Sequence, residues 1–371
     1  METQLELYRT TLEYLVVQAM RYRFIVAPNP TVGACLLYND TIVAEGYHSH
    51  FGGKHAEIVC LENACEKGIP IEQCTLVVTL EPCIHYGKTP PCVEAILASG
   101  VRRIVIGATD PHLTASGGIS FLQEHNVEVI LLENARTKYC LQDFTMWNHY
   151  QLPHIIVKLA TTMDGYIATR EYHSQWITHH TTREYMHSVR ALLGKAHGAI
   201  MVGAHTLRCD NPKLYAVHDT AISHPRPIIV SKTLGGLDTS FLVMHRGTEC
   251  IVITCREAVK NPLFKKIQNM GVSFVIAGEE SIDLKEALHI LYSQYQIWYV
   301  FCEGGSMLAH SLISLPIPIE LWHCVAPLLF ADSHAIPMLS GGSPRTVDEA
   351  YSFQLQTVHT LHNDIIAIYT K

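Results

Sequence analysis

The chain has 371 residues, a net charge of −7, 48% hydrophobic residues and 16% charged residues. This length exceeds what one core usually supports and predicts two domains, while the composition is typical of a well-buried globular protein and excludes a disordered or fibrous one. The acidic balance and the lack of a stripe of Lys and Arg also argue against nucleic acid as a partner.

Helices and strands alternate over the first 130 residues. Apolar positions at helical spacing predict an amphipathic helix over 6–22, and two apolar runs flanking Asn39 and Asp40 predict a hairpin. The further predicted elements are a helix at 55–67, a strand at 75–80, a helix at 92–99, a strand at 102–108, a helix at 117–125 and a strand at 127–132. This alternation indicates an α/β layered domain.

The sequence shows neither the pattern of a signal peptide nor that of a membrane-spanning helix. The first residues are acidic where a signal peptide would be basic, and no apolar run approaches the roughly 18 residues needed to cross a bilayer. We therefore expect a cytoplasmic protein with no membrane partner. In that setting the twelve cysteines are expected to be buried thiols or metal ligands rather than disulfides.

A connecting helix over 134–152 and a linker ending at Pro153 place a domain boundary near 148–153, giving domains 1–150 and 151–371. The second domain continues the α/β pattern. Its predicted strands are 154–168, 198–204, 226–232, 249–255, 272–277, 298–305, 319–330 and 363–370, and its predicted helices are 181–196 and 283–294.

The stretches "HAEIVC" at 55–60 and "TLEPCIHYGKTPPC" at 79–92 combine metal-binding side chains. If His55, Cys83 and Cys92 lie at helix N-termini facing one point, they supply one nitrogen and two sulfurs and leave the fourth tetrahedral position of a zinc ion open for catalysis. Helix N-termini also favour the thiolate form. Glu57 would then be the proton shuttle of a hydrolytic deamination.

This pattern, a His-x-Glu followed by Pro-Cys and a second Cys, matches the zinc deaminase signature, although eight residues separate the two cysteines here instead of two. The simpler alternatives are a structural zinc site, or a buried His with two unrelated core thiols. Three ligand types in this order, with a Glu two residues after the His, favour the catalytic interpretation.

The same loop, with "APNPTVGA" at 27–34, "GYHSHFGGKHAE" at 46–57 and "DPH" at 110–112, resembles the bifunctional pyrimidine deaminase/reductase family of riboflavin biosynthesis. The second half is similar to that family's reductase in "KLATTMDGYIA", "SQWIT", "AHTLRCDNPKL" and "CEGGSMLAHSL". The resemblance implies a cytidine deaminase-like three-layer α/β/α domain followed by a dihydrofolate reductase-like α/β domain.

By this resemblance the first domain uses Zn²⁺ to deaminate a diaminopyrimidinone that carries a phosphoribosylamino arm, and the second uses NADPH to reduce the ribosyl arm to ribityl. The implied zinc ligands are His55, Cys83 and Cys92, and the catalytic acid/base is Glu57. The implied substrate-binding residues are Asn29, His48, Lys88 and Asp110 in the first domain and Ser174, Arg190, Leu214 and Glu303 in the second. The implied NADPH-binding residues are Thr161, Trp176, Thr206, Asp210, Gly304, Gly305 and Ser306. We also expect a homo-oligomer, a dimer or a tetramer.

Several positions depart from the family. His112 replaces the usual Asn, and "TASGG" at 114–118 lacks an Arg. Val217 stands where the family usually has an Arg suited to the substrate phosphate, and Tyr166 replaces a basic residue. We therefore expect the reductase to discriminate weakly between phosphorylated and dephosphorylated substrate, unless Lys213 or His218 supplies the missing charge.

Two further interpretations remain open at this point. One is an active deaminase whose second domain is a degenerate reductase retained for substrate binding or dimerisation. The other is a nucleic-acid-editing deaminase with an accessory binding module, which the acidic net charge and the lack of interleaved basic and aromatic residues disfavour.

Overall fold

The computed structural model describes residues 2–86, 90–112, 116–216 and 224–371. The chain forms two compact units, Met1–Tyr150 (unit 1) and Gln151–Lys371 (unit 2). Each unit has its own β-sheet. In the part of the chain that the structure describes, no helix is both long enough and apolar enough to pass through a bilayer.

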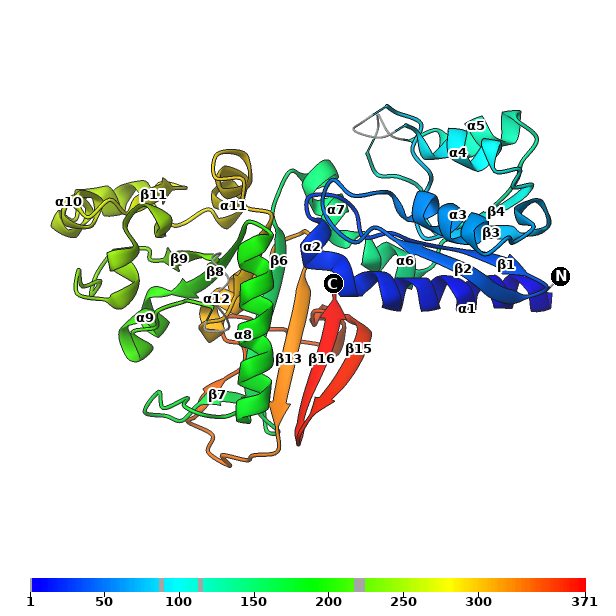
Figure 1. Cartoon of the computed structure of the whole chain (residues 1–371). Coiled ribbons are helices and arrows are strands. Elements are labelled where there is room, and N and C mark those ends of the chain that lie inside the picture. Colours follow the sequence, from blue (N-terminus) through cyan, green and yellow to red (C-terminus); the bar gives the residue numbers. More distant parts are fainter. Residues whose placement is uncertain (1, 87–89, 113–115, 217–223) are drawn as a thin grey trace. The chain divides into compact units, whose positions relative to one another are not determined.

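Unit 1 is built on a five-stranded sheet in the order β2-β1-β3-β4-β5 (Figure 1). Its strands are β1 Gly33–Tyr38, β2 Thr41–Tyr47, β3 Thr75–Val78, β4 Arg103–Ile106 and β5 Glu128–Leu131. Its helices are α1 Glu2–Ala19, α2 Arg23–Val26, α3 Ala56–Glu66, α4 Cys92–Ala98, α5 Gly118–Glu124, α6 Ala135–Cys140 and α7 Gln142–Thr145. β1 pairs antiparallel with β2 and β3, whereas β3, β4 and β5 run parallel.

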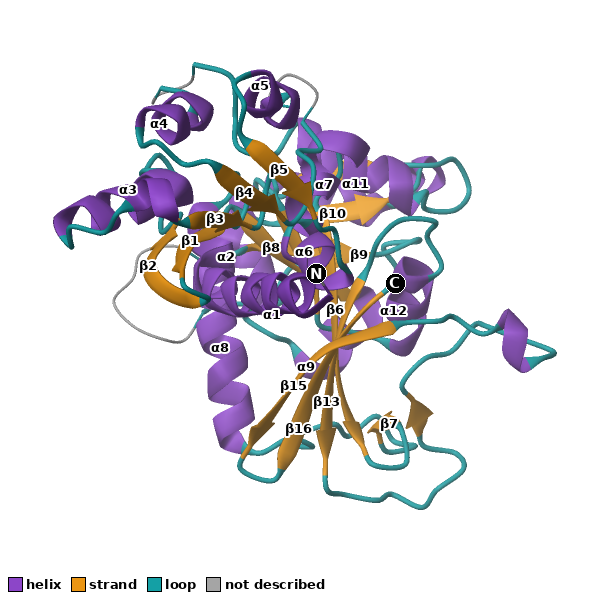
Figure 2. Ribbon diagram, turned by 90° about the vertical axis from the view of Figure 1, so that its right-hand side faces the viewer, coloured by secondary structure: helices purple, strands orange, loops and turns teal. Residues whose placement is uncertain are grey.

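Alternate residues of the unit 1 strands face two separate hydrophobic cores, because successive side chains of a strand point to opposite faces. One core includes Leu36 and Leu76 with side chains of α3, α4 and α5, and the other includes Cys35 and Val77 with side chains of α1. Helices therefore cover both faces of the sheet, as Figure 2 shows. This three-layer α/β/α arrangement confirms the fold class predicted for the first domain.

The predicted hairpin is confirmed and its turn explains the sequence. Asn39 and Asp40 have φ values of 47° and 61°, the left-handed region that a two-residue type I′ turn requires. Asn and Asp tolerate that region better than other non-glycine residues. The turn sets the β1–β2 register, in which Gly33 pairs with Tyr47.

The single connecting helix predicted over 134–152 is wrong. The chain forms α6, then α7, then a π-helical turn over Met146–Tyr150. α6 ends at Cys140, and the residue that caps it, Leu141, departs from helical geometry with φ −103° and ψ 5°. The new direction turns Asp143 inward, where its carboxylate accepts a 2.8 Å hydrogen bond from Arg23 with both side chains only 3% exposed. This tertiary ion pair is not visible in the local apolar spacing.

Unit 2 contains a nine-stranded sheet in the order β11-β10-β9-β8-β12-β6-β13-β16-β15 and a small two-stranded sheet of β14 and β7. Its strands are β6 His154–Thr162, β7 Tyr166–Ala168, β8 Gly198–Gly203, β9 Arg226–Val230, β10 Ile251–Thr254, β11 Ser273–Ile276, β12 Tyr299–Cys302, β13 Glu320–Ala326, β14 Ile336–Pro337, β15 Gln354–Leu361 and β16 Asp364–Thr370. Its helices are α8 His180–Lys195, α9 Ala204–Asp210, α10 Pro262–Asn269, α11 Leu284–Ser293 and α12 Ser306–Ile313.

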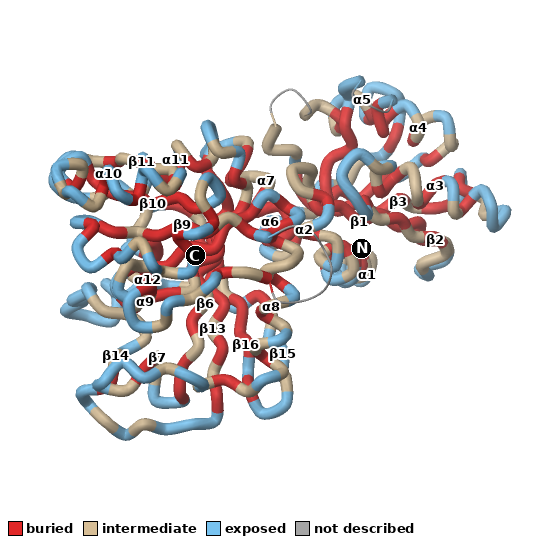
Figure 3. The backbone as a smooth tube through the Cα atoms, turned by 60° about the vertical axis from the view of Figure 1, so that its left-hand side comes forward, coloured by how far each residue is buried: buried red, intermediate tan, exposed pale blue. Residues whose placement is uncertain are grey.

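The central strands of the large sheet are parallel and buried, which explains their continuous apolar sequences. Figure 3 shows them as the buried centre of the unit. β16 and β15 add an antiparallel edge. The predicted single strand over 154–168 is divided into β6 and β7 by a turn at Gly165, whose φ of 84° favours glycine.

Candidate active sites in the two units

The three predicted metal ligands of unit 1 lie together. His55 Nδ1 is 3.1 Å from Cys92 Sγ and 3.6 Å from Cys83 Sγ, and the three ligand atoms all lie within 4.8 Å of one another. A tetrahedral zinc ion with Zn–N near 2.0 Å and Zn–S near 2.3 Å would hold such atoms roughly 3.5 to 3.8 Å apart. One imidazole nitrogen and two sulfurs at these distances fit Zn²⁺.

Local structure brings these side chains to one point. His55 is the N-cap of α3, and Cys92 is the first residue of α4, directly after Pro91. The prediction that Cys83 also begins a helix is wrong, because it lies in an irregular segment after β3. That segment leaves the carboxyl end of a central strand, and the backbone N–H of Cys92 lies 3.4 Å from Cys83 Sγ.

The two thiols are electrostatically unequal. A hydrogen bond from Cys92 lowers the pKa of Cys83, and its hydrogen bond to His55 acts in the same direction. The shared hydrogen bond, followed by burial, raises the pKa of Cys92. The hydrogen bond to Cys83 in turn raises the pKa of His55. The two sulfurs thus share one hydrogen bond, and the thiolate form that binds metals is favoured on the acceptor, Cys83.

Glu57 follows His55 in the first turn of α3 and is only 4% exposed. Burial raises the pKa of its carboxyl group, because desolvation disfavours the charged form. It lines the same cavity of about 250 Å³ as His55 and Cys83. A carboxyl group with a raised pKa beside an open metal position has the chemistry of a general acid and base.

Asn29 and His48 line this cavity as a hydrogen-bonded pair. His48 Nδ1 lies 2.9 Å from the carbonyl oxygen of Lys54, so it must donate a proton there, and Nε2 then accepts from the Asn29 amide at 2.9 Å. Burial lowers the pKa of His48, in keeping with a neutral ring. The pair thus presents fixed polar groups to a ligand.

Asp110 and His112 also line the cavity, and burial raises the pKa of Asp110. The Asp110 carboxylate accepts a 2.8 Å hydrogen bond from the His112 backbone. Glu81, 5% exposed, accepts from the backbone N–H groups of Asp110, Gly117 and Ile119 at 3.0 Å each. Glu81 is part of the stretch "TLEPC", but the sequence indicates no role for it, because its hydrogen-bond donors lie about 30 to 40 residues further along the chain. The predicted substrate residue Lys88 lies outside the described residues.

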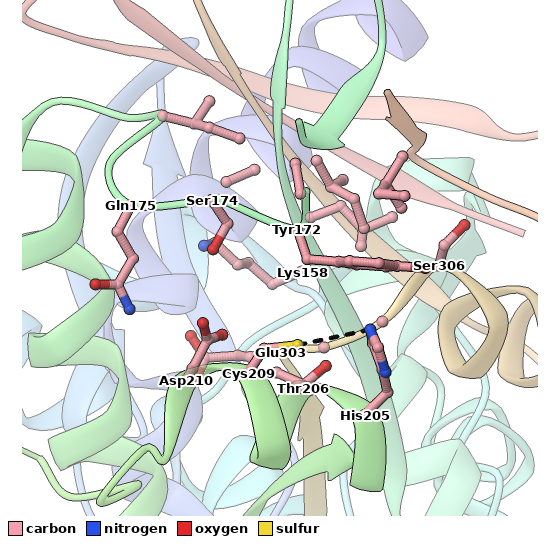
Figure 4. Close-up of a pocket in the computed structure, with 18 of the residues that line it drawn as sticks. Lys158, Tyr172, Ser174, Gln175, His205, Thr206, Cys209, Asp210, Glu303 and Ser306 are labelled. Carbon is pink, nitrogen blue, oxygen red and sulfur yellow. Dashed lines mark hydrogen bonds between the residues drawn. The ribbon is translucent and has the colours of Figure 1, made fainter. Parts of the chain in front are cut away.

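Unit 2 has a cavity of about 710 Å³ at the carboxyl ends of β8 and β12 (Figure 4). Ligands of open α/β sheets bind at this edge. The predicted residues that line it are Ser174, Trp176, Arg190, Thr206, Asp210, Glu303, Gly304, Gly305 and Ser306. They come from α8, α9, the turn after β12 and the segment before α8.

The turn after β12 is shaped for close approach. A Cβ added to Gly304 would lie 3.0 Å from Thr206 Oγ1, and Gly305 has a φ of 75°. Ser306 is 6% exposed, and its hydroxyl has no hydrogen-bond partner among the described residues. A buried hydroxyl at the start of α12 that faces a cavity is suited to a phosphate or other polar ligand.

Arg190 and Glu303 form an ion pair of 2.7 Å inside this cavity. Two other predicted residues do not line it within the described structure. Thr161 is buried and lies 2.9 Å from His323 Nε2, and Leu214, 3% exposed, packs in the core beside β8. From this part of β6 the cavity is lined by Lys158, Leu159 and Ala160 instead.

The positions that depart from the family are only partly visible. Val217 and His218 lie outside the described residues, while Lys213 is exposed and Tyr166 stacks on Phe330 at 6.5 Å between ring centroids. The expectation of weak phosphate discrimination therefore stays a prediction.

Sequence reasoning missed several basic side chains that line the larger cavity. They are Lys158, Arg183, His187, His205 and Arg208. Arg183, His187 and Arg190 recur at i, i+4 and i+7 on α8, a spacing that places them on one helix face and could have indicated them. The cavity is therefore lined by several basic side chains, although position 217 is Val where the family usually has Arg.

Comparison with known proteins relates each unit to a family. Residues 9–108 match the family described as the cytidine and deoxycytidylate deaminase zinc-binding region, and residues 153–367 match the RibD C-terminal domain. The riboflavin biosynthesis protein RibD of Actinobacillus pleuropneumoniae is 31% identical over 349 residues, covering 92% of this chain and 89% of that protein. RibD of Aquifex aeolicus is also 31% identical, covering 93% of both chains.

Solved structures support the same relationship over the full length. A diaminohydroxyphosphoribosylaminopyrimidine deaminase/5-amino-6-(5-phosphoribosylamino)uracil reductase from Thermotoga maritima matches with a TM-score of 0.73 and 28% identity, covering 99% of each chain. Acinetobacter baumannii RibD matches with a TM-score of 0.73 and 26% identity, covering 98% of this chain and 99% of that one. The two-part fold expected from the sequence is confirmed, and the chain belongs to the RibD family of riboflavin biosynthesis proteins.

Proposed function

We propose that the two cavities carry out two successive steps of riboflavin biosynthesis in one chain. Unit 1 removes an amino group by zinc-dependent hydrolysis from a diaminopyrimidinone that carries a phosphoribosylamino arm. Unit 2 then reduces the ribosyl arm to ribityl with NADPH. The observation that carries this proposal is the convergence of His55, Cys83, Cys92 and Glu57 in a unit matched by the deaminase zinc-binding region, followed by a RibD C-terminal domain.

In unit 1, His55, Cys83 and Cys92 would hold Zn²⁺, which supplies a Lewis acid for activating water at the open fourth position. Glu57 lines the same cavity as His55 and Cys83 and would take a proton from the attacking water and return it to the departing amine. Burial of its carboxyl group raises its pKa, which favours the protonated form that returns the proton to the amine.

Asn29, His48 and Asp110 are proposed to orient the pyrimidine. The amide and neutral imidazole offer directional hydrogen bonds, and the carboxyl group of Asp110 can pair with an N–H edge of the ring. A cavity of about 250 Å³ suits a single heterocycle better than a stretch of nucleic acid.

In unit 2, Trp176, Thr206, Asp210 and the Gly304-Gly305-Ser306 turn are proposed to bind NADPH, which supplies the hydride. Backbone N–H groups of the turn and the Ser306 hydroxyl suit the diphosphate. Ser174, Arg190 and Glu303 face the same cavity and are proposed to bind the ribosyl substrate. The ion pair between Arg190 and Glu303 fixes the two side chains relative to each other.

The test is to incubate the protein with the diaminopyrimidinone phosphate with and without NADPH and to separate the products. Without NADPH we expect only the deaminated pyrimidine with its ribosyl arm intact. With NADPH we expect the ribityl product and one NADPH oxidised per molecule formed. Deamination without any NADPH oxidation would show that unit 2 is not a reductase, and no deamination would contradict the assignment of unit 1.

We also propose a cytoplasmic location and a homo-oligomeric state. All twelve cysteines are free thiols, which suits a reducing compartment. The edge strand β15 exposes Leu355 and Val358, and Ile365 on the adjacent β16 is also exposed. Exposed apolar side chains on a sheet edge are suited to pairing with a second copy. Sedimentation of the purified chain measures the oligomeric state.

A further inference from the structure

Arg208 lies at one edge of the unit 2 cavity, on α9. Its Nη1 donates a 3.1 Å hydrogen bond to the carbonyl oxygen of Gly235, in the turn after β9. A Cβ added to Gly236 would come within 2.9 Å of Arg208 Cδ, and the φ of Gly236 is 70°. The turn therefore leaves room for the arginine stem at a position where a side chain would collide with it.

The turn that anchors Arg208 is itself well defined. Leu234 is fully buried, and its backbone N–H donates to Ser231 Oγ at 3.2 Å. The N–H of Gly235 donates to Thr233 Oγ1, also at 3.2 Å. These bonds position the Gly235 carbonyl as the acceptor for Arg208, whose side chain is exposed at the cavity edge.

The charge of Arg208 is balanced differently from that of the other cavity arginines. Arg190 pairs with Glu303 at 2.7 Å, and the Arg183 guanidinium lies 4.5 Å from the centroid of the Trp176 ring. Within the described residues, Arg208 has no ion pair with a carboxylate, and its hydrogen bond to Gly235 uses one nitrogen. The remaining guanidinium donors are therefore suited to an anion.

The position of Arg208 relative to the glycine turn indicates which anion. Gly304 packs against Thr206 of α9, so the proposed diphosphate site lies next to this helix. The turn that holds Arg208 follows β9, which leaves the same carboxyl edge as its parallel neighbours β8 and β12. His205 lies on the same edge, one helix turn from Cys209, and Figure 4 shows it below Ser306. In a dinucleotide, the adenosine ribose follows the diphosphate directly. An extra phosphate on that ribose distinguishes NADPH from NADH.

We propose that Arg208, with His205 beside it, binds the phosphate monoester on the adenosine ribose of NADPH and so determines the preference for NADPH over NADH. This inference rests on the proposed cofactor site of unit 2. Arginine presents several N–H donors in a planar fork that matches phosphate oxygens. A charged hydrogen bond of this kind accounts for a preference of about 10- to 150-fold.

The test measures binding of NADPH and of NADH to the full chain by isothermal titration calorimetry. The unmodified protein should prefer NADPH, and Arg208→Met should lose most of that preference by weakening NADPH alone. Arg208→Lys should retain part of it. Arg226→Met is the matched control, because Arg226 also donates one 3.1 Å hydrogen bond to a backbone carbonyl, that of Thr248, but lies at the opposite end of β9. It should leave the preference unchanged.

Two smaller probes identify the source of the phosphate. Adenosine 2′-monophosphate should bind the unmodified protein more tightly than it binds the Arg208→Met variant, whereas ribose 5-phosphate should bind both equally. A loss confined to ribose 5-phosphate would assign Arg208 to the substrate and overturn the proposal.

The remaining outcomes separate this inference from the proposed function. Equal weakening of NADPH and NADH in Arg208→Met would mean that Arg208 only supports the turn after β9, which contradicts the inference and leaves the cofactor site intact. Equal binding of the two dinucleotides by the unmodified protein would do the same. Binding of neither dinucleotide would overturn both the inference and the NADPH site.

Discussion

Individual side chains decide the chemistry of unit 1, because one imidazole and two sulfurs must surround a single point. The chain offers ten further cysteines, most of them buried, so a thiol alone carries little information. What distinguishes Cys83 from them is its position, because its sulfur lies within 4.8 Å of His55 Nδ1 and of Cys92 Sγ. The assignment can be tested by removing that thiol.

Cys83→Ser should lose most of its bound zinc, because His55 and Cys92 alone do not enforce a tetrahedral site. Elemental analysis of the purified proteins measures this directly. Cys65→Ser is the control, since Cys65 lies exposed on α3, the helix that His55 caps. Undiminished zinc in the Cys83 variant would show that the ligand set is wrong.

Glu57→Gln should keep its zinc and its fold but lose about two to four orders of magnitude in the rate of deamination, roughly what general acid/base catalysis contributes. Glutamine retains the shape and hydrogen bonding of the side chain but cannot take a proton from water. Glu62→Gln provides the comparison, because Glu62 lies on the same helix as Glu57 but is exposed, where it forms an ion pair with Lys54. A near-normal rate of deamination in the Glu57 variant would contradict the proposed mechanism.

At the scale of secondary-structure elements, the buried pair of Arg23 and Asp143 joins α2 to α7 within unit 1. Both side chains are only 3% exposed, so neither charge is solvated when its partner is missing. Removing one member of such a pair leaves an uncompensated buried charge, which is far more costly than breaking an exposed pair.

Asp143→Asn should therefore reduce the free energy of unfolding of unit 1 by about 3 to 5 kcal/mol. Glu128→Gln makes the same chemical change in the exposed pair with Arg103, where both side chains are about half exposed, and should cost at most about 1 kcal/mol. Urea denaturation of the zinc-loaded protein measures both, using the transition that depends on zinc. Equal effects of the two substitutions would contradict the importance of burial.

At the scale of the whole molecule, the two units have separate cores and separate ligand sites. A ligand stabilises the folded form of the unit that binds it, by an amount that grows with its concentration relative to its dissociation constant. Binding at one cavity should therefore leave the stability of the other unit nearly unchanged.

Calorimetric heating should show two transitions. Removal of zinc by a chelator should lower the melting temperature of unit 1 only. NADPH at about 100 times its dissociation constant should raise the free energy of unfolding of unit 2 only, by about 2.7 kcal/mol. A single transition that responds to both treatments would mean that the units unfold together.

The sequence by itself determined the α/β alternation, the hairpin at Asn39 and Asp40, and the cluster of His55, Cys83 and Cys92, and it predicted Glu57 as the proton shuttle. These features are local, because a turn needs particular residues at fixed positions and His55 and Glu57 begin one helix. The resemblance of motifs along the chain supplied the function, and it extended to the glycine turn after β12.

Only the tertiary structure decided how remote segments complete each site. Glu81 accepts hydrogen bonds from the backbone of Asp110, Gly117 and Ile119. The helix predicted as continuous over 134–152 is divided between α6 and α7, and Asp143 of α7 pairs with Arg23. The cations of α8 and α9 meet the glycine turn because β8 and β12 are neighbours in a parallel sheet, although about 100 residues separate them. Hydrogen bonds and charges act through space, so the partners that fix these side chains cannot be read from residues adjacent in sequence.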